Sequence, residues 1–216
     1  MNKVYYLQNR NSSGLILLEG AIISSIVTIL FVAILGFTEH LNLINVSNQI
    51  LKQELGQQVL SGSSFTNNSL KHNRQVLLLE KLSRNIQEKL DQHGVKNDEF
   101  SLITALSKVD SKDKTSSAEL TSKYLTGNRS LDLDNNFESM ALAAFQSSGS
   151  SATYKNDYQT KFLSLKDNTL STSTFFILGR LVIKPQGGIF KILKAINRDS
   201  SIKVEAVLPF KLQYQL

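Results

Sequence analysis

The feature that most constrains the fold of this chain is a long apolar run near its N-terminus, over residues 15–37. A helix rises about 1.5 Å per residue, so this run would reach roughly 30 Å, the thickness of the hydrocarbon core of a bilayer. A helix in a soluble core rarely stays apolar on every side over such a length. The run is therefore predicted to be a transmembrane helix, and Glu19 is its single ionisable residue.

The residues before this run form a short basic segment. Residues 1–14 contain Lys3 and Arg10 and no acidic residue. Because positive flanks stay in the cytoplasm, the pattern predicts a cytoplasmic N-terminus and an exported C-terminal part. A cleaved secretory signal has a shorter apolar core, of about 7–15 residues, followed by a small-x-small site. The run is longer and no such site follows it, so we expect a retained single-pass anchor.

Helical periodicity continues beyond the apolar run. Apolar residues recur at helical spacing up to Val59, with amides and charges between them and no proline. One continuous helix is predicted over residues 15–60, apolar all round in its first half and amphipathic in its second. Residues 61–95 are predicted to hold a polar linker and a second amphipathic helix, with the stripe Val76, Leu79, Leu82, Ile86 and Leu90 and with Gly94 as its C-terminal cap.

The second half of the chain changes from weak signals to strand signals. Residues 96–173 are predicted to be variable and loop-rich, with an apolar stretch of ambiguous type over 100–109, a short helix over 137–145, and loops over 110–123 and 146–157. Residues 174–216 alternate strand formers with turn clusters, which predicts three or four antiparallel strands over 175–184, 189–196, 202–207 and 210–216, with a break at Pro209. The expected fold class is α+β, with a long N-terminal helix packed on a small domain that ends in antiparallel strands.

Composition narrows the possible functions. The chain has 216 residues and no cysteine, which excludes disulfides and thiolate metal sites. Its net charge is +6, and the C-terminal region is rich in lysine and arginine. A solvated charged face is favoured over an acidic partner or a membrane surface, and no nucleic-acid motif accompanies these charges. We therefore expect no nucleic-acid partner.

Enzymatic motifs are missing from the sequence. The three histidines, His40, His72 and His93, lie in different segments without ligand spacing, and His40 is expected to be exposed at the membrane interface. Residues 132–136 begin like a calcium loop but lack the glycine and the acidic residue that such a loop needs further on. Neither a Gly-x-Ser-x-Gly elbow nor a phosphate-binding glycine loop is present. We expect no enzyme, no metal site and no cofactor.

One pattern at the start of the apolar run carries a family resemblance. Gly14 and Glu19 form Gly-x-x-x-x-Glu at the boundary between the basic leader and the apolar run. This arrangement resembles the processing site of type IV prepilins and pseudopilins, and the chain is most similar to the TadE-like pseudopilins of tight-adherence (Flp-type) pilus systems. Gly36-Phe-Thr-Glu39 resembles the Gly-x-x-acid pattern that those proteins have at the end of the span. The resemblance covers residues 10–39, and the chain departs from the family at Leu15 and Gly20.

The resemblance implies a function for the whole chain. A prepilin peptidase would cut between Gly14 and Leu15, and the Glu19 carboxylate would pair with the N-terminal amine of a neighbouring subunit. Gly36 and Glu39 would lie at the membrane interface. The protein would be a pseudopilin or minor pilin of the bacterial inner membrane, with its C-terminal domain periplasmic, or extracellular after assembly. It would act in a pilus for adhesion or in a secretion pseudopilus, with other pilin subunits as partners.

An alternative remains open at this point. The chain could be an unprocessed single-pass envelope protein whose extracytoplasmic domain binds a partner. The two hypotheses differ in whether the mature protein still begins at Met1.

Overall fold

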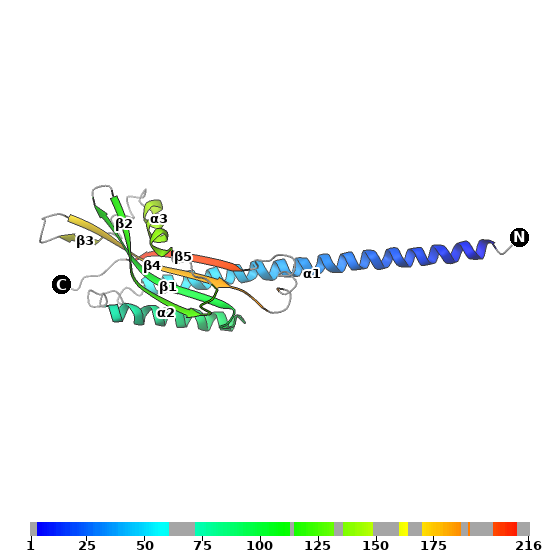
Figure 1. Ribbon diagram of the computed structural model, residues 1–216, viewed down its shortest axis with the longest axis horizontal. Helices are drawn as coiled ribbons and strands as arrows, with labels where there is room; N and C mark the ends of the chain where they lie inside the picture. The colour runs from blue at the N-terminus through cyan, green and yellow to red at the C-terminus, as the bar shows by residue number, and fades with distance from the viewer. Residues whose placement is uncertain are drawn as a thin grey trace. The chain divides into compact units, whose positions relative to one another are not determined.

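A computed structural model of the chain describes residues 4–60, 72–112, 115–131, 136–148, 160–163, 170–186, 190 and 201–210. The chain divides into two compact units, one of residues 1–43 and 187–199 and one of residues 44–186 and 200–216. The elements follow in the order α1 (Val4–Leu60), α2 (His72–Gln92), β1 (Phe100–Lys112), β2 (Thr115–Gly127), α3 (Phe137–Ser148), β3 (Thr160–Leu163), β4 (Leu170–Ile183) and β5 (Ile202–Phe210) (Figure 1). The α+β class, with a long N-terminal helix and an antiparallel sheet, is confirmed.

The first helix ends where its periodicity predicted but begins earlier. α1 ends at Leu60 and begins at Val4 rather than at Leu15. No proline and no glycine precede Gly14, so nothing in the leader stops the helix. In the second unit α1 buries one face, at the three- and four-residue spacing of an amphipathic helix, formed by Ser47, Ile50, Leu51, Glu54 and Leu55.

The second helix also agrees with its predicted stripe. Leu79, Leu82, Ile86 and Leu90 of α2 are all buried. Gly94 has a φ of 80°, and the following Val95 N–H donates to the Leu90 carbonyl at 3.0 Å. Only glycine adopts this left-handed conformation without strain, so the predicted C-terminal cap is confirmed.

The strands form one antiparallel sheet in the order β2-β1-β4-β3, with β5 also paired to β4. β3 pairs with the first residues of β4, from Leu170 to Ser173, and β5 pairs with the part from Phe175 to Ile183. The predicted strands over 175–184 and 202–207 therefore correspond to β4 and β5, paired as neighbours. The strands predicted over 189–196 and 210–216 lie outside the described residues, apart from Phe190 and Phe210.

Two predictions for the middle and end of the chain are wrong. The stretch 110–123 was expected to be a loop, but β1 runs to Lys112 and β2 begins at Thr115, so the loop-rich region contains two long strands. Pro209 was expected to break the last strands, but β5 continues through it. In the described residues β5 pairs only with β4, and an edge strand tolerates a residue that has no N–H to donate.

Helices cover both faces of the sheet in the second unit (Figure 1). On one face Ile103, Ala105, Phe176 and Leu178 pack with Phe137 and Ala141 of α3. On the other face Thr104 of β1 receives α2, since its hydroxyl lies 2.8 Å from the Ser83 hydroxyl. β1 is therefore buried on both sides, and the predicted short helix over 137–145 is confirmed as α3.

A row of small residues across three strands makes room for α1. Thr104, Gly179 and Ala206 are neighbours in β1, β4 and β5. A Cβ atom on Gly179 would lie 2.7 Å from Cδ1 of Leu51 and 3.2 Å from Cδ1 of Leu55. The side chains of α1 thus touch the backbone of the central strand, which no larger residue would permit.

Candidate functional site

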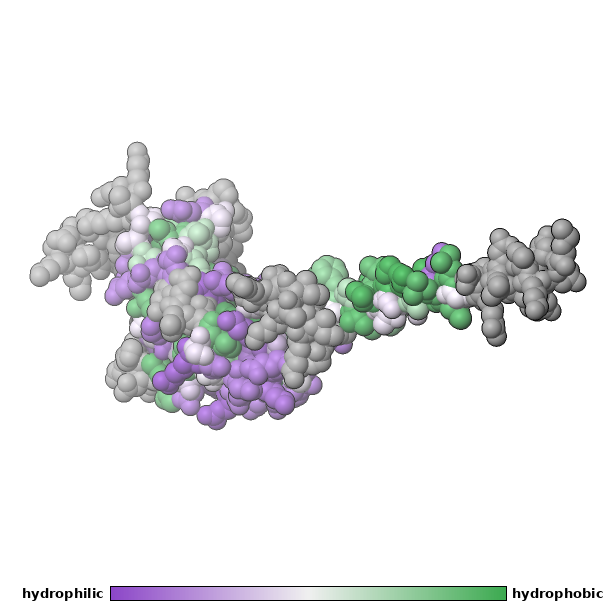
Figure 2. Space-filling model, turned by 45° about the vertical axis from the view of Figure 1, so that its right-hand side comes forward, coloured by the Kyte–Doolittle hydropathy of each residue, from purple (hydrophilic) through white to green (hydrophobic). Residues whose placement is uncertain are grey.

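The most unusual surface of the described chain is the apolar part of α1. Leu17 and Ile29 expose 75% and 68% of their surface, and the large apolar residues between Leu15 and Phe37 are exposed along the whole segment (Figure 2). Soluble proteins rarely expose a continuous apolar surface of this size. Within the described residues this is the helix that is long and apolar enough to cross a membrane. Its surface suits lipid or other apolar helices.

The residues of the predicted cleavage site lie in this helix and are exposed. Cβ atoms placed on Gly14 or Gly20 would meet nothing within 4 Å. Glycine costs about 1 kcal/mol relative to alanine inside a helix, so packing within the chain gives no reason for Gly14. Leu15 exposes 60% of its surface. Both residues are therefore available to another protein.

Glu19 is exposed among apolar side chains. None of the described side chains donates a hydrogen bond to its carboxylate or forms an ion pair with it. A carboxylate inside a membrane helix costs about 2.5–3.5 kcal/mol at the centre of the bilayer and less near the interface. Glu19 therefore has the capacity to accept a positive partner from outside the described chain.

Hydroxyl groups in the span turn inward to the helix backbone. The side chains of Ser25, Thr28 and Thr38 donate hydrogen bonds to the carbonyl oxygens four residues earlier, at 2.8 to 2.9 Å. These bonds satisfy the hydroxyls without water. The sequence shows these three residues only as polar interruptions, whereas the structure shows that they leave the exterior of the helix apolar.

The predicted interface residues differ in their environment. Gly36 is buried and Glu39 is exposed. His40 is half-buried rather than exposed as expected, and its ring lies 6.3 Å from the ring of Phe190, measured between centroids. Its Nδ1 atom is buried without a hydrogen-bond partner among the described residues. The aromatic contact explains why His40 is less accessible than its polar neighbours in the sequence indicated.

The basic C-terminal region is only partly a solvated face. Arg180 of β4 is buried and its Nε donates to Glu205 Oε1 of β5 at 2.8 Å. The same guanidinium lies 5.0 Å from the centroid of the Phe137 ring in α3. This arginine therefore holds α3 on the sheet instead of meeting a partner. Lys184 and Lys203 are exposed, as the favoured interpretation predicted.

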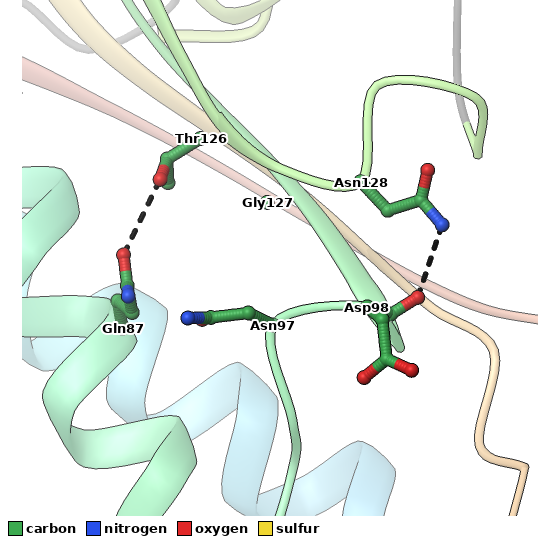
Figure 3. A pocket seen from close by; sticks show the side chains of 6 residues that line it. All are labelled: Gln87, Asn97, Asp98, Thr126, Gly127 and Asn128. Atoms are coloured by element: carbon green, nitrogen blue, oxygen red, sulfur yellow. Dashed lines mark hydrogen bonds between the residues drawn. The ribbon is translucent and has the colours of Figure 1, made fainter.

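A shallow polar depression of about 470 Å³ lies on the second unit (Figure 3). It forms where α2, the turn before β1 and the end of β2 meet, and it is lined by Gln87, Asn97, Asp98, Thr126, Gly127 and Asn128. Thr126 Oγ1 donates to Gln87 Oε1 at 3.3 Å, and Asn128 Nδ2 donates to the Asp98 carbonyl at 3.0 Å. Amides and one carboxylate can hydrogen-bond a polar molecule, but they include no nucleophile beside a base. No sequence motif pointed to this depression.

The described residues offer no group of three or more His, Cys, Asp or Glu side chains that could hold a metal ion. Comparisons with protein-family models, with curated proteins and with solved structures found no match.

Proposed function

We propose that this protein is a membrane-anchored pseudopilin or minor pilin that assembles through α1. The observation that carries the proposal is a fully exposed apolar helix with one carboxylate, Glu19, placed five residues after a glycine that packing does not require. A prepilin peptidase would cut between Gly14 and Leu15. Cleavage would remove the leader and leave a free amine on Leu15.

The chemistry of the new N-terminus supports a role for Glu19. An α-amine has a pKa near 8 in ordinary surroundings, so it is mostly protonated at neutral pH. An isolated carboxylate and an isolated ammonium are each costly among apolar helices, and pairing between subunits removes much of that cost. The pair would form only in one axial register, so Glu19 would act in assembly and not in catalysis.

The second unit would be exported and joined to this helix. Its sheet holds the C-terminal part of α1 through the contacts of Leu51 and Leu55 with Gly179. A domain held in this way follows its helix into an assembly, because the two share one continuous element. The protein would prime, cap or decorate a pilus or a secretion pseudopilus in the bacterial inner membrane.

The test is the intact mass of the full-length protein extracted from membranes of cells that contain a prepilin peptidase. The expected species begins at Leu15. A Gly14→Leu variant should keep Met1 and the leader, because a bulky residue would not fit the peptidase, whereas Gly20→Leu serves as the matched glycine control. If the wild-type protein keeps Met1, the proposal fails and the alternative of an unprocessed single-pass envelope protein takes its place.

A further inference from the structure

The exposed side of α1 in the second unit differs from an ordinary solvent-facing helix. Four exposed amides follow at intervals of four residues: Asn45, Gln49, Gln53 and Gln57. Side chains at this spacing form a single ridge along a helix surface, the kind that fits into the groove of another helix. We call these four residues the amide ridge. It lies opposite the face that α1 packs on the sheet, which includes Leu51 and Leu55.

The charge content of this surface is low. Within residues 44–60, all of which the structure describes, the ionisable residues are Lys52 and Glu54, and Glu54 is buried. The second helix of the same unit provides an internal comparison. Its exposed face carries charged residues at helical spacing, namely Lys81, Arg84, Glu88 and Asp91. Solvated helix faces normally look like that of α2, so the surface of α1 calls for another explanation.

Primary amides suit an interface between identical helices. Each amide group carries both donors and acceptors, so a ridge of amides can pair with a second copy of itself. Burying a neutral amide is affordable once it is hydrogen-bonded, whereas two like charges brought together would repel. The chemistry therefore favours a like-with-like contact over contact with a charged partner.

The same four-residue spacing continues toward the membrane segment. Counting back from Asn45, the next positions are Leu41 and Phe37, whose side chains are exposed by 43% and 62%. On this one helix, apolar positions suited to lipid or apolar neighbours thus give way to amides. That change is what an interface needs where it leaves the hydrocarbon and enters water.

We propose that the amide ridge is an interaction surface for a second copy of this chain, which lies against it along α1. This inference rests on the proposed function, since it takes assembly through α1 as given. It adds that the contact continues past the membrane segment, over residues 45–57, and that hydrogen bonds between amides hold it.

Single-cysteine variants of the full chain in its native membranes test the ridge directly, because the wild-type chain has no cysteine. Gln49→Cys and Gln53→Cys lie on the ridge, Glu88→Cys lies on the exposed face of α2, and Ile26→Cys reports on the membrane segment. After oxidation, disulfide-linked dimer from the ridge variants should exceed that from Glu88→Cys several-fold. Gln49→Glu should reduce recovery of assembled fibres several-fold by bringing like charges together, whereas Lys81→Glu should leave it unchanged.

The outcomes separate the two proposals. If Ile26→Cys is cross-linked and the ridge variants match Glu88→Cys, this inference is wrong while the proposed function stands. If none of the four variants is cross-linked, both are wrong. Resistance to limited proteolysis, compared with wild type, verifies that each variant is folded. A folded Gln49→Glu variant that forms fibres at the wild-type level would also overturn the inference.

Discussion

The contact between α1 and the central strand can be tested with one methyl group. In Gly179→Ala the new Cβ would lie 2.7 Å from Cδ1 of Leu51, which is closer than carbon atoms approach. Overpacking a core costs about 1–3 kcal/mol, and replacing a strand glycine by alanine returns about 0.5–1 kcal/mol. We expect the free energy of unfolding to fall by about 1–2 kcal/mol on this balance.

The same substitution at Gly56 is the matched control. A Cβ on Gly56 of α1 would meet nothing within 4 Å, so only the gain in helix propensity remains. Gly56→Ala should therefore raise the free energy of unfolding by about 0.5–1 kcal/mol. The two glycines thus predict effects of opposite sign for an identical chemical change.

A double-mutant cycle identifies the partner atom. Leu51→Ala alone should cost about 2–5 kcal/mol, because it leaves a cavity beside Gly179. In the double variant the alanine methyl at 179 occupies part of that cavity, so the two costs should add to less than their sum, by about 1 kcal/mol. Pulse proteolysis of the full-length protein in detergent and urea measures all three free energies. If Gly179→Ala is as stable as Gly56→Ala, or if the cycle is additive, the close approach of α1 to β4 is refuted.

Two charges provide further predictions. Lys89 Nζ lies 2.5 Å from Glu54 Oε1, and the Glu54 side chain is only 4% exposed. Lys89→Met should therefore lower the free energy of unfolding by about 2–4 kcal/mol, since a buried carboxylate is left alone, and adding Glu54→Gln should restore most of it. Pulse proteolysis measures both variants, and equal stability of Lys89→Met and wild type would contradict the pair. In the membrane segment, Glu19→Gln should keep or increase the membrane-bound fraction, because it removes an insertion cost of up to about 2.5–3.5 kcal/mol. The same variant should yield fewer fibres when sheared material is quantified, and wild-type fibre recovery would count against the role of Glu19.

The missed strand β2 shows where pattern reading fails. Strands are recognised by alternation, but in β2 the register with β1 shifts at Leu106 and Ser107. Ala118 and Leu120 pack toward α3, whereas Ser122 bonds to Gln75 of α2. The bulge reverses the alternation halfway along the strand, and the edge position keeps the residues polar. The window 110–123 therefore looked like a loop.

The neighbouring strand was ambiguous for the opposite reason. β1 is covered by helices on both faces, so residues 100–107 are all buried and show no alternation. Its polar members, such as Thr104 and Ser107, are satisfied by partners far away in the sequence, at Ser83 and Glu119. Nothing local distinguishes such a stretch from a buried helix.

The sequence by itself determined the features that depend on local periodicity. The extent of the apolar run, the end of α1 at Leu60, the cap at Gly94 and the alternation of β5 all follow from residues within a few turns of each other. Tertiary structure alone decided which positions meet across long separations. It buried Arg180 beside Glu205, and it brought Gly179 against Leu51. The physical reason is that helix and strand patterns record which face is apolar, whereas strand pairing and helix seating depend on shapes that come together only in the folded chain.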